Sequence, residues 1–202
     1  RGSGRRPSSR AKAGGAESGA LRASLQLERR RVYVSEHSRE LLRALGISAH
    51  DLAPSVARLR AVKSSAELAL MRRAAEAISG AVADAMPRTR GGMTERQLGA
   101  LVEFGASARG AQRMAFATIV AGGPRSSYLH YSANSDVLSD GELVLVDAGA
   151  ELDGYASDVT RAWPVSGTFS AAQRRIYEVV LAANKRCIAA ARAGSSLDEV
   201  EA

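Results

Sequence analysis

The sequence predicts an α+β domain, and three observations carry this prediction. Capping boxes, in which Ser or Thr is followed three residues later by Glu or Gln, occur four times and announce helices. Strand-like stretches near 114–121, 143–149 and 155–163 stand between the helical segments. The pair Asp153-Gly154 separates two of these stretches and favours a tight hairpin turn. Helices combined with antiparallel strands define the α+β class.

Helices are expected after each of the four capping boxes. The first expected helix, about 65–86, and the third, about 171–192, both place apolar residues on one stripe at helical spacing. Because an apolar stripe is buried in a folded domain, we expect both helices to lie against a sheet. The stripe of the third helix includes Cys187, which we therefore expect in the core. The boxes are Ser64 with Glu67, Thr94 with Gln97, Ser170 with Gln173, and Ser196 with Glu199.

The composition is that of one domain of ordinary size. The chain has 202 residues, of which 46% are hydrophobic and 24% charged, and no apolar run approaches the length of a membrane span. Cys187 is the single cysteine, which excludes a disulfide framework within the chain and favours a reducing compartment. Neither a transmembrane helix nor a membrane partner is expected.

All of the excess positive charge lies at the start of the chain. Residues 1–31 contain nine Arg or Lys against two acidic residues, and the other 171 residues carry 19 of each sign. This segment is rich in Arg, Ser, Gly and Ala and poor in bulky apolar residues, so we expect it to be disordered. Its composition is typical of organelle transit peptides and of basic arms. Nucleic acid is not expected as a partner, because no aromatic platform and no recognisable nucleic-acid module accompanies the charge.

Three segments are expected along the chain. They are a basic disordered tail over 1–31, a linker or the remnant of an N-terminal domain over 32–55, and the main domain over 56–202. The middle segment contains the sequence "SRELLRALG", which predicts a short helix that ends at Gly46 as a cap.

Two aspartates, Asp147 and Asp158, stand inside the strand-like stretches of the hairpin. A buried carboxylate is costly without a cation or a hydrogen-bond network, although aspartates also occur at exposed strand ends. If Asp153 and Gly154 form the turn, then Asp147 pairs with Thr160. This register places the two aspartates on one face as diagonal neighbours, roughly 7–8 Å apart between backbones. A slip by one residue would send them to opposite faces.

The polar residues that could converge near this hairpin are few. They are Asp147 and Asp158, Thr160 beside them, and His130 in the sequence "SSYLHYSAN". Two carboxylates and an imidazole suit hard or borderline divalent ions such as Mn²⁺, whereas a single cysteine excludes thiolate sites. A site with two such ions activates water at neutral pH. The reaction class that this set favours is hydrolysis.

The same residues carry a resemblance to a known family. The ordered motifs "DAG", "SDVTR" and "WPVSG", with "LRAVKSSAELALMRRAAE" upstream, closely resemble the pita-bread metallopeptidases. Among these, the match is to Xaa-Pro aminopeptidases and especially to the mitochondrial member, and it covers roughly residues 56–200. The resemblance implies a pita-bread fold of the creatinase/aminopeptidase type. It implies that only the first of the two related α+β halves of the catalytic domain is present.

The resemblance also implies roles for individual residues. Asp147 corresponds to the aspartate that chelates one metal ion, and Asp158 to the aspartate that bridges two. His130 corresponds to the catalytic histidine that lies beside the substrate and positions the peptide group to be cleaved. The implied cofactor is a pair of Mn²⁺ ions, which the 202-residue chain can hold only in part. The implied substrates are peptides with proline at the second position.

The family needs a further histidine and two glutamates as ligands, and no residue of this chain matches them. We therefore expect the chain by itself to be inactive. Two alternatives stay open: a prolidase-type dipeptidase that cleaves Xaa-Pro dipeptides, and a non-catalytic pita-bread interaction protein with a basic tail. The resemblance and the tail composition favour a mitochondrial location, with the cytoplasm as the alternative. A homo-oligomer is left open for the full-length protein.

Overall fold

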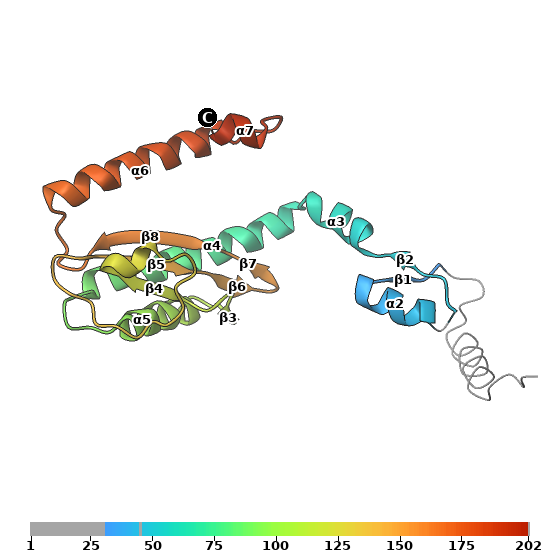
Figure 1. Ribbon diagram of the computed structural model, residues 1–202, viewed down its shortest axis with the longest axis horizontal. Helices are drawn as coiled ribbons and strands as arrows, with labels where there is room; N and C mark the ends of the chain where they lie inside the picture. The colour runs from blue at the N-terminus through green and yellow to red at the C-terminus, as the bar shows by residue number, and fades with distance from the viewer. Residues whose placement is uncertain (1–30, 45, 202) are drawn as a thin grey trace, which may run out of the picture. The chain divides into compact units, whose positions relative to one another are not determined.

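The computed structural model describes residues 31–44 and 46–201 and divides the chain into two units, Arg1–Ser64 and Ser65–Ala202 (Figure 1). The predicted disorder of the basic tail falls almost wholly on residues 1–30, which lie outside the described part. The expected segment boundaries at 31 and 55 stay predictions.

The first unit contains a small two-stranded sheet and two short helices. Its strands are parallel and pair Tyr33 with His50, whose rings lie 5.4 Å apart between centroids. Gly46 has a φ of 69° and follows the first helix, as predicted for a glycine cap. The elements are β1 (Tyr33–Val34), α2 (Glu36–Ala44), β2 (His50–Asp51) and α3 (Ala53–Ala61).

The second unit combines helices with two antiparallel sheets, which confirms the predicted α+β class. The sheets have the strand orders β3-β6-β7 and β4-β5-β8 (Figure 1). The helical elements are α4 (Ser65–Ala85), η2 (Met86–Arg88), α5 (Glu95–Ala108), η3 (Gly123–Ser127), α6 (Ala171–Ala190) and α7 (Leu197–Glu201). The strands are β3 (Arg113–Met114), β4 (Ile119–Gly122), β5 (Leu143–Ala148), β6 (Ala150–Leu152), β7 (Tyr155–Ala156) and β8 (Val159–Pro164).

The strand register is the one that the sequence predicts. Asp147 lies opposite Thr160, and Leu152 lies opposite Tyr155. The turn residues Asp153 and Gly154 both have positive φ, at 49° and 84°, as a type I′ turn requires.

The strands are shorter and more divided than the sequence indicates. The expected strand over 114–121 is two strands, β3 and β4, in different sheets. The hairpin is likewise split, because the chain leaves one sheet at Gly149 and enters the other. A Cβ at position 149 would overlap the carbonyl oxygen of Ser157 and the ring of Phe116. Glycine therefore allows the close approach at which the hairpin changes sheets.

The core of the second unit lies where α4 and α5 pack against each other and against the strands. Helix α4 buries Ala74, Ile78 and Val82 along one face, as its apolar stripe predicts. Burying an Ile or Val side chain contributes about 1.5–3 kcal/mol to the free energy of unfolding. The predicted capping box at the start of α5 is present, since Thr94 and Gln97 bond each other's backbone N–H groups at 3.1 and 2.9 Å.

Helix α6 corrects two expectations. It forms with its predicted capping box, yet none of its residues is buried, so the expected packing against a sheet is wrong. The stripe residues Ile176 and Val179 are 67% and 70% exposed. Cys187 is partly exposed rather than in the core. A capping box acts within one turn of chain, whereas burial needs a facing surface, which the described residues do not present to α6.

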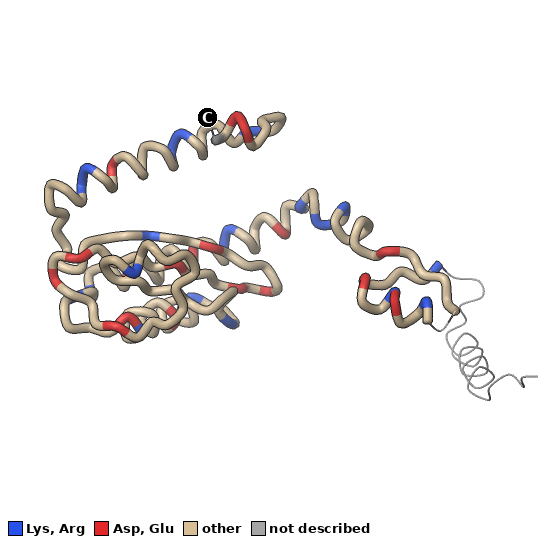
Figure 2. The backbone as a smooth tube through the Cα atoms, viewed as in Figure 1, with Lys and Arg blue, Asp and Glu red and all other residues tan. Residues whose placement is uncertain are grey.

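Charges of both signs are interspersed along α4 and α6 (Figure 2). No helix in the described part has the length and apolar character that crossing a membrane requires.

Candidate metal centre

Asp147 occupies a defined face of strand β5. Alternate residues of this strand, Val144, Val146 and Ala148, are buried in the core. Because side chains of a strand alternate between its two faces, Asp147 points to the face opposite the core. The carboxylate is half-buried there and accepts a hydrogen bond from the Thr160 hydroxyl, from Oγ1 to Oδ1 at 2.9 Å.

Asp158 lies in the connection between β7 and β8 and faces Asp147. Its side chain is exposed, yet its pKa is raised above the ordinary value. The first cause is the partial burial of its carboxyl group, followed by the hydrogen bond with Asp147 and the negative charge of Asp147. The predicted convergence of the two aspartates is therefore confirmed.

His130 joins the two aspartates at one cavity. This cavity has a volume of about 370 Å³ and is open to solvent on one side. His130 is exposed and has a φ of 55°, a left-handed conformation that is uncommon for a residue with a side chain. The lining residues are Phe116, Ala117, Ile119, His130, Ser132, Asp147 and Asp158. Three of the four polar residues that the sequence analysis singled out thus line one cavity, and the fourth, Thr160, donates a hydrogen bond to Asp147 beside it.

The donor set of this cavity fits a divalent cation. Two adjacent carboxylates supply hard oxygen ligands, and the negative charge of Asp147 adds to burial and to their hydrogen bond in raising the pKa of Asp158. Among residues 31–44 and 46–201, no three His, Cys, Asp or Glu side chains gather in a group that could hold a metal ion. Asp147 and Asp158 would therefore be part of a coordination shell.

The apolar side of the cavity was missed in the sequence analysis. Phe116 and Ile119 belong to the segment around β4, and Ser132 lies two residues after His130. Strand periodicity alone does not distinguish an apolar residue that faces a cavity from one that faces the core. Only the pairing of Ile119 with Asp147 across two strands places that side chain beside the aspartates.

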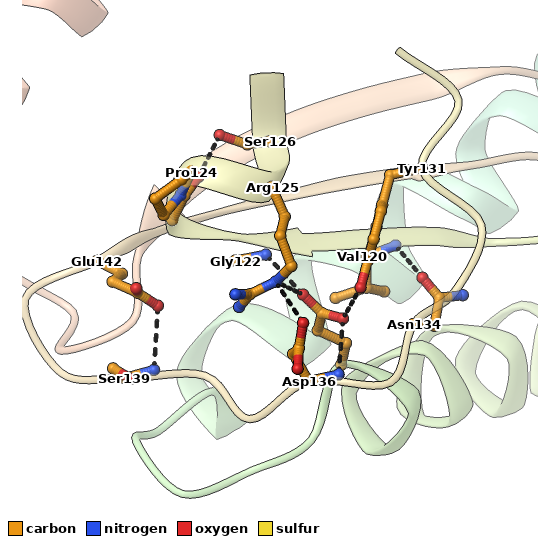
Figure 3. A network of polar contacts seen from close by, with 12 residues as sticks. Val120, Gly122, Pro124, Arg125, Ser126, Tyr131, Asn134, Asp136, Ser139 and Glu142 are labelled. Carbon is orange, nitrogen blue, oxygen red and sulfur yellow. Dashed lines mark hydrogen bonds and ion pairs between the residues drawn. The ribbon is translucent and has the colours of Figure 1, made fainter. Parts of the chain in front are cut away.

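A second polar cluster, centred on Glu95, was also missed. Glu95 is wholly buried in the first turn of α5. Its Oε1 accepts hydrogen bonds from Gly122 N at 3.0 Å and Arg125 Nε at 2.7 Å, and its Oε2 accepts from Tyr131 Oη at 2.8 Å and Asp136 N at 3.1 Å (Figure 3). The sequence signal was only an acidic residue after an N-cap, which is ordinarily solvated.

The electrostatics of Glu95 are opposite to those of Asp158. Burial alone would raise the pKa of Glu95, but hydrogen bonds from Gly122, Arg125, Asp136 and Tyr131 outweigh burial and lower it. This carboxylate is therefore charged, neutralised by Arg125 and saturated with donors.

The comparisons with known proteins agree with this fold. Residues 69–202 match the model of metallopeptidase family M24. The chain therefore belongs to metallopeptidase family M24, a family of metal-dependent peptidases.

Several named relatives narrow the similarity within the family. The chain is 44% identical over 142 residues to the mitochondrial intermediate cleaving peptidase 55 of Arabidopsis thaliana, and 42% identical over 145 residues to human Xaa-Pro aminopeptidase 3. It is 41% identical over 150 residues to the Xaa-Pro aminopeptidase of Escherichia coli. These matches cover 70%, 72% and 74% of this chain. The chain spans only 29%, 29% and 34% of the length of these relatives.

Solved structures of aminopeptidase P have the same fold. A variant of the Escherichia coli enzyme superimposes with a TM-score of 0.77 at 34% identity, over 84% of this chain and 42% of that one. The aminopeptidase P II of Yersinia pestis gives a TM-score of 0.75 at 36% identity, over 84% and 43%. The predicted pita-bread fold, represented by part of the domain, is thus confirmed.

Proposed function

We propose that this chain contributes the metal-chelating aspartates and the substrate histidine of an aminopeptidase that removes the N-terminal residue preceding proline. The observation that carries this proposal is the single cavity lined by Asp147, Asp158 and His130. The named relatives support the substrate class, since the human and bacterial ones are Xaa-Pro aminopeptidases.

In this proposal Asp147 and Asp158 hold divalent ions, and Mn²⁺ is the ion that we propose because oxygen ligands suit it. When bound, such ions make the attack of water on a peptide bond feasible at neutral pH. The hydroxyl of Thr160 holds the carboxylate of Asp147 in one orientation.

The remaining lining residues would bind the peptide. His130 can hydrogen-bond the peptide group beside the aspartates, where it would orient the bond to be cleaved. Phe116 and Ile119 offer an apolar wall that suits a proline ring or an aliphatic side chain.

The first test concerns the 202-residue chain and Mn²⁺ alone. Titration calorimetry should detect Mn²⁺ binding that Asp158→Asn weakens and that Asp153→Asn, a turn residue outside the cavity, leaves unchanged. Equal binding by the parent and Asp158→Asn would contradict the metal assignment.

The second test concerns activity. Because the chain spans 29% of the human relative, turnover should be assayed in a longer protein, one that joins these residues to the further length found in that relative, with Mn²⁺ and Xaa-Pro peptides. We expect cleavage of peptides longer than two residues, and His130→Ala should slow it by about 10²-fold or more. Cleavage restricted to Xaa-Pro dipeptides would identify a prolidase-type dipeptidase instead.

For location, we propose the mitochondrion. One relative is mitochondrial by name, whereas another is bacterial, and the Arg- and Ser-rich composition of residues 1–31 resembles that of transit peptides. Fluorescence microscopy of the tagged longer protein should show mitochondrial signal, and diffuse cytoplasmic signal would contradict the proposal.

A further inference from the structure

The segment that carries His130 is a loop with little regular structure of its own. We call residues 123–135 the His130 loop; it leaves strand β4 after Gly122 and ends at Asp136. After a short η3 turn it has no helix or strand, and His130 is exposed. Such a loop needs anchors elsewhere if its histidine is to keep one position at the cavity.

Glu95 contacts the His130 loop or its boundaries at four points. It accepts from Gly122 at the entry, from Arg125 in the first turn, from Tyr131 beside His130, and from Asp136 at the exit. Glu95 and Asp136 form two hydrogen bonds at the exit, because the N–H of Glu95 also donates to the carbonyl oxygen of Asp136 at 2.9 Å. Figure 3 shows the side chains of Arg125 and Tyr131 extending from the loop and converging between Gly122 and Asp136.

The charges around Glu95 make this anchor strong. Arg125 Nε also lies 3.3 Å from Asp136 Oδ2, so one guanidinium forms ion pairs with two carboxylates. Hydrogen bonds to a buried charged group are stronger than neutral ones and are costly to leave unmade. The anchor therefore consists of charge-assisted hydrogen bonds that are costly to break.

Asn134 adds a second attachment beside the first. Its Oδ1 accepts from Val120 N at 2.9 Å and its Nδ2 donates to the Thr118 carbonyl oxygen at 2.7 Å. Both partners flank Ile119, which lines the cavity. The His130 loop is thus attached to β4 at both ends: it continues from Gly122 at its start, and near its end Asn134 bonds the backbone on either side of Ile119, the residue paired with Asp147.

Glu95 itself does not reach the cavity. It is wholly buried and is absent from the lining of the site. Any effect on chemistry must therefore pass through the loop, and the shortest covalent route is from Tyr131 to the adjacent His130.

We propose that Glu95 is a positioning residue for peptide cleavage, which fixes the His130 loop against strand β4 by bonding its entry, its first turn, Tyr131 and its exit. This inference rests on the proposed function for its effect on catalysis. The mechanical part of it, that Glu95 holds the loop, does not.

The first experiment measures the loop directly in the 202-residue chain. Hydrogen exchange should be compared for the parent, Glu95→Gln and the control Glu151→Gln, which removes a carboxylate that pairs with exposed Arg113 away from the loop. In Glu95→Gln the amides of residues 123–136 should exchange about 10-fold faster, while those of β5 stay unchanged. The control should match the parent. Unchanged loop exchange, or equal acceleration in β5, would overturn the proposal.

If Glu95→Gln does not fold, the less disruptive substitution Tyr131→Phe provides the test. Tyr131→Phe keeps the carboxylate and Arg125 and deletes one donor to Glu95. In this variant the side-chain NMR signals of His130 should shift, while those of His37 and His50 stay in place. Unmoved His130 signals would contradict the route through Tyr131.

The second experiment uses the longer protein with Mn²⁺ and an Xaa-Pro peptide. Tyr131→Phe should lower kcat by about 10-fold with little change in KM or in Mn²⁺ affinity, because it misplaces His130 without touching the metal. A parallel fall in Mn²⁺ affinity would indicate a general structural role and would overturn the positioning role. If the parent cleaves no Xaa-Pro peptide, the proposed function fails, and the exchange result still decides whether Glu95 holds the loop.

Discussion

The molecule contains two carboxylate clusters, one around Glu95 and one formed by Asp147 and Asp158, that differ in how their negative charge is compensated. Glu95 is wholly buried, accepts four hydrogen bonds and has a lowered pKa. Asp158 is exposed, faces another carboxylate and has a raised pKa. The donors of Glu95 come from this chain, whereas the pair of Asp147 and Asp158 is short of positive charge. The Glu95 carboxylate thus has all of its partners within the described chain, whereas we propose that the aspartate pair receives a cation.

The largest expected effect comes from removing the cation of the complete cluster. Arg125→Met leaves the buried Glu95 carboxylate without its ion pair, so the free energy of unfolding should fall by about 3 kcal/mol. Urea denaturation would measure it. The matched control is Arg113→Met, which removes the exposed arginine that pairs with Glu151 and should lower the free energy of unfolding far less, because solvent screens that pair. Equal losses would mean that the Glu95 cluster is no stronger than a surface pair.

The pH dependence of stability should separate the two clusters next. The pKa of Glu95 is lowered in the folded state. Its ionisation therefore contributes fully to the free energy of unfolding above about pH 4.5, and this contribution is lost as the pH falls through the folded-state pKa. Asp158 has the opposite effect, because its pKa is raised in the folded state. As the pH falls from that folded-state pKa to the ordinary value of 3.8, protonation of Asp158 increases the free energy of unfolding.

Melting temperatures between pH 7 and pH 3 would test this difference. The deficit of Glu95→Gln relative to the parent should shrink as the pH falls. Any gain of Asp158→Asn over the parent should also shrink, because the parent aspartate becomes neutral. A deficit of Glu95→Gln that is constant with pH would contradict the charged state of Glu95.

The incomplete cluster should respond to its orienting hydroxyl. Thr160→Val removes the donor to Asp147 Oδ1 while keeping the shape of the side chain. Mn²⁺ affinity of the chain should fall by about 10-fold, which is the usual consequence of losing a partner that orients a ligand. Titration calorimetry measures it, and Thr168→Val, in the segment after β8 that does not line the cavity, serves as control. Unaltered affinity would place Thr160 outside the site.

The smallest effect is a gain rather than a loss. Without metal, Asp158→Asn removes the repulsion with Asp147 and should stabilise the chain by about 0.5 kcal/mol, since an exposed charge is well screened. With Mn²⁺ the order should reverse, because only the parent keeps both ligands and gains binding energy. Thermal melts with and without Mn²⁺ would show the crossing, and parallel shifts would argue against metal binding at this pair.

The two long helices show that sequence patterns predict helix formation but not burial. Helices α4 and α6 have 21 and 20 residues and share the same kind of apolar stripe, and both begin where the capping boxes predict. Only α4 is buried. The boxes and the periodicity were sufficient for helix formation because they act between residues three or four positions apart. They contain no information about which surface faces the stripe.

The site shows the same division. By itself the sequence determined the α+β class, the hairpin register and the meeting of Asp147 with Asp158, because the type I′ turn at Asp153 and Gly154 transmits its register along two strands. Only the tertiary structure brought His130 to the aspartates and buried Glu95 beneath its loop. Those contacts join residues up to 41 positions apart. Such contacts depend on packing between separate elements, which no local pattern specifies.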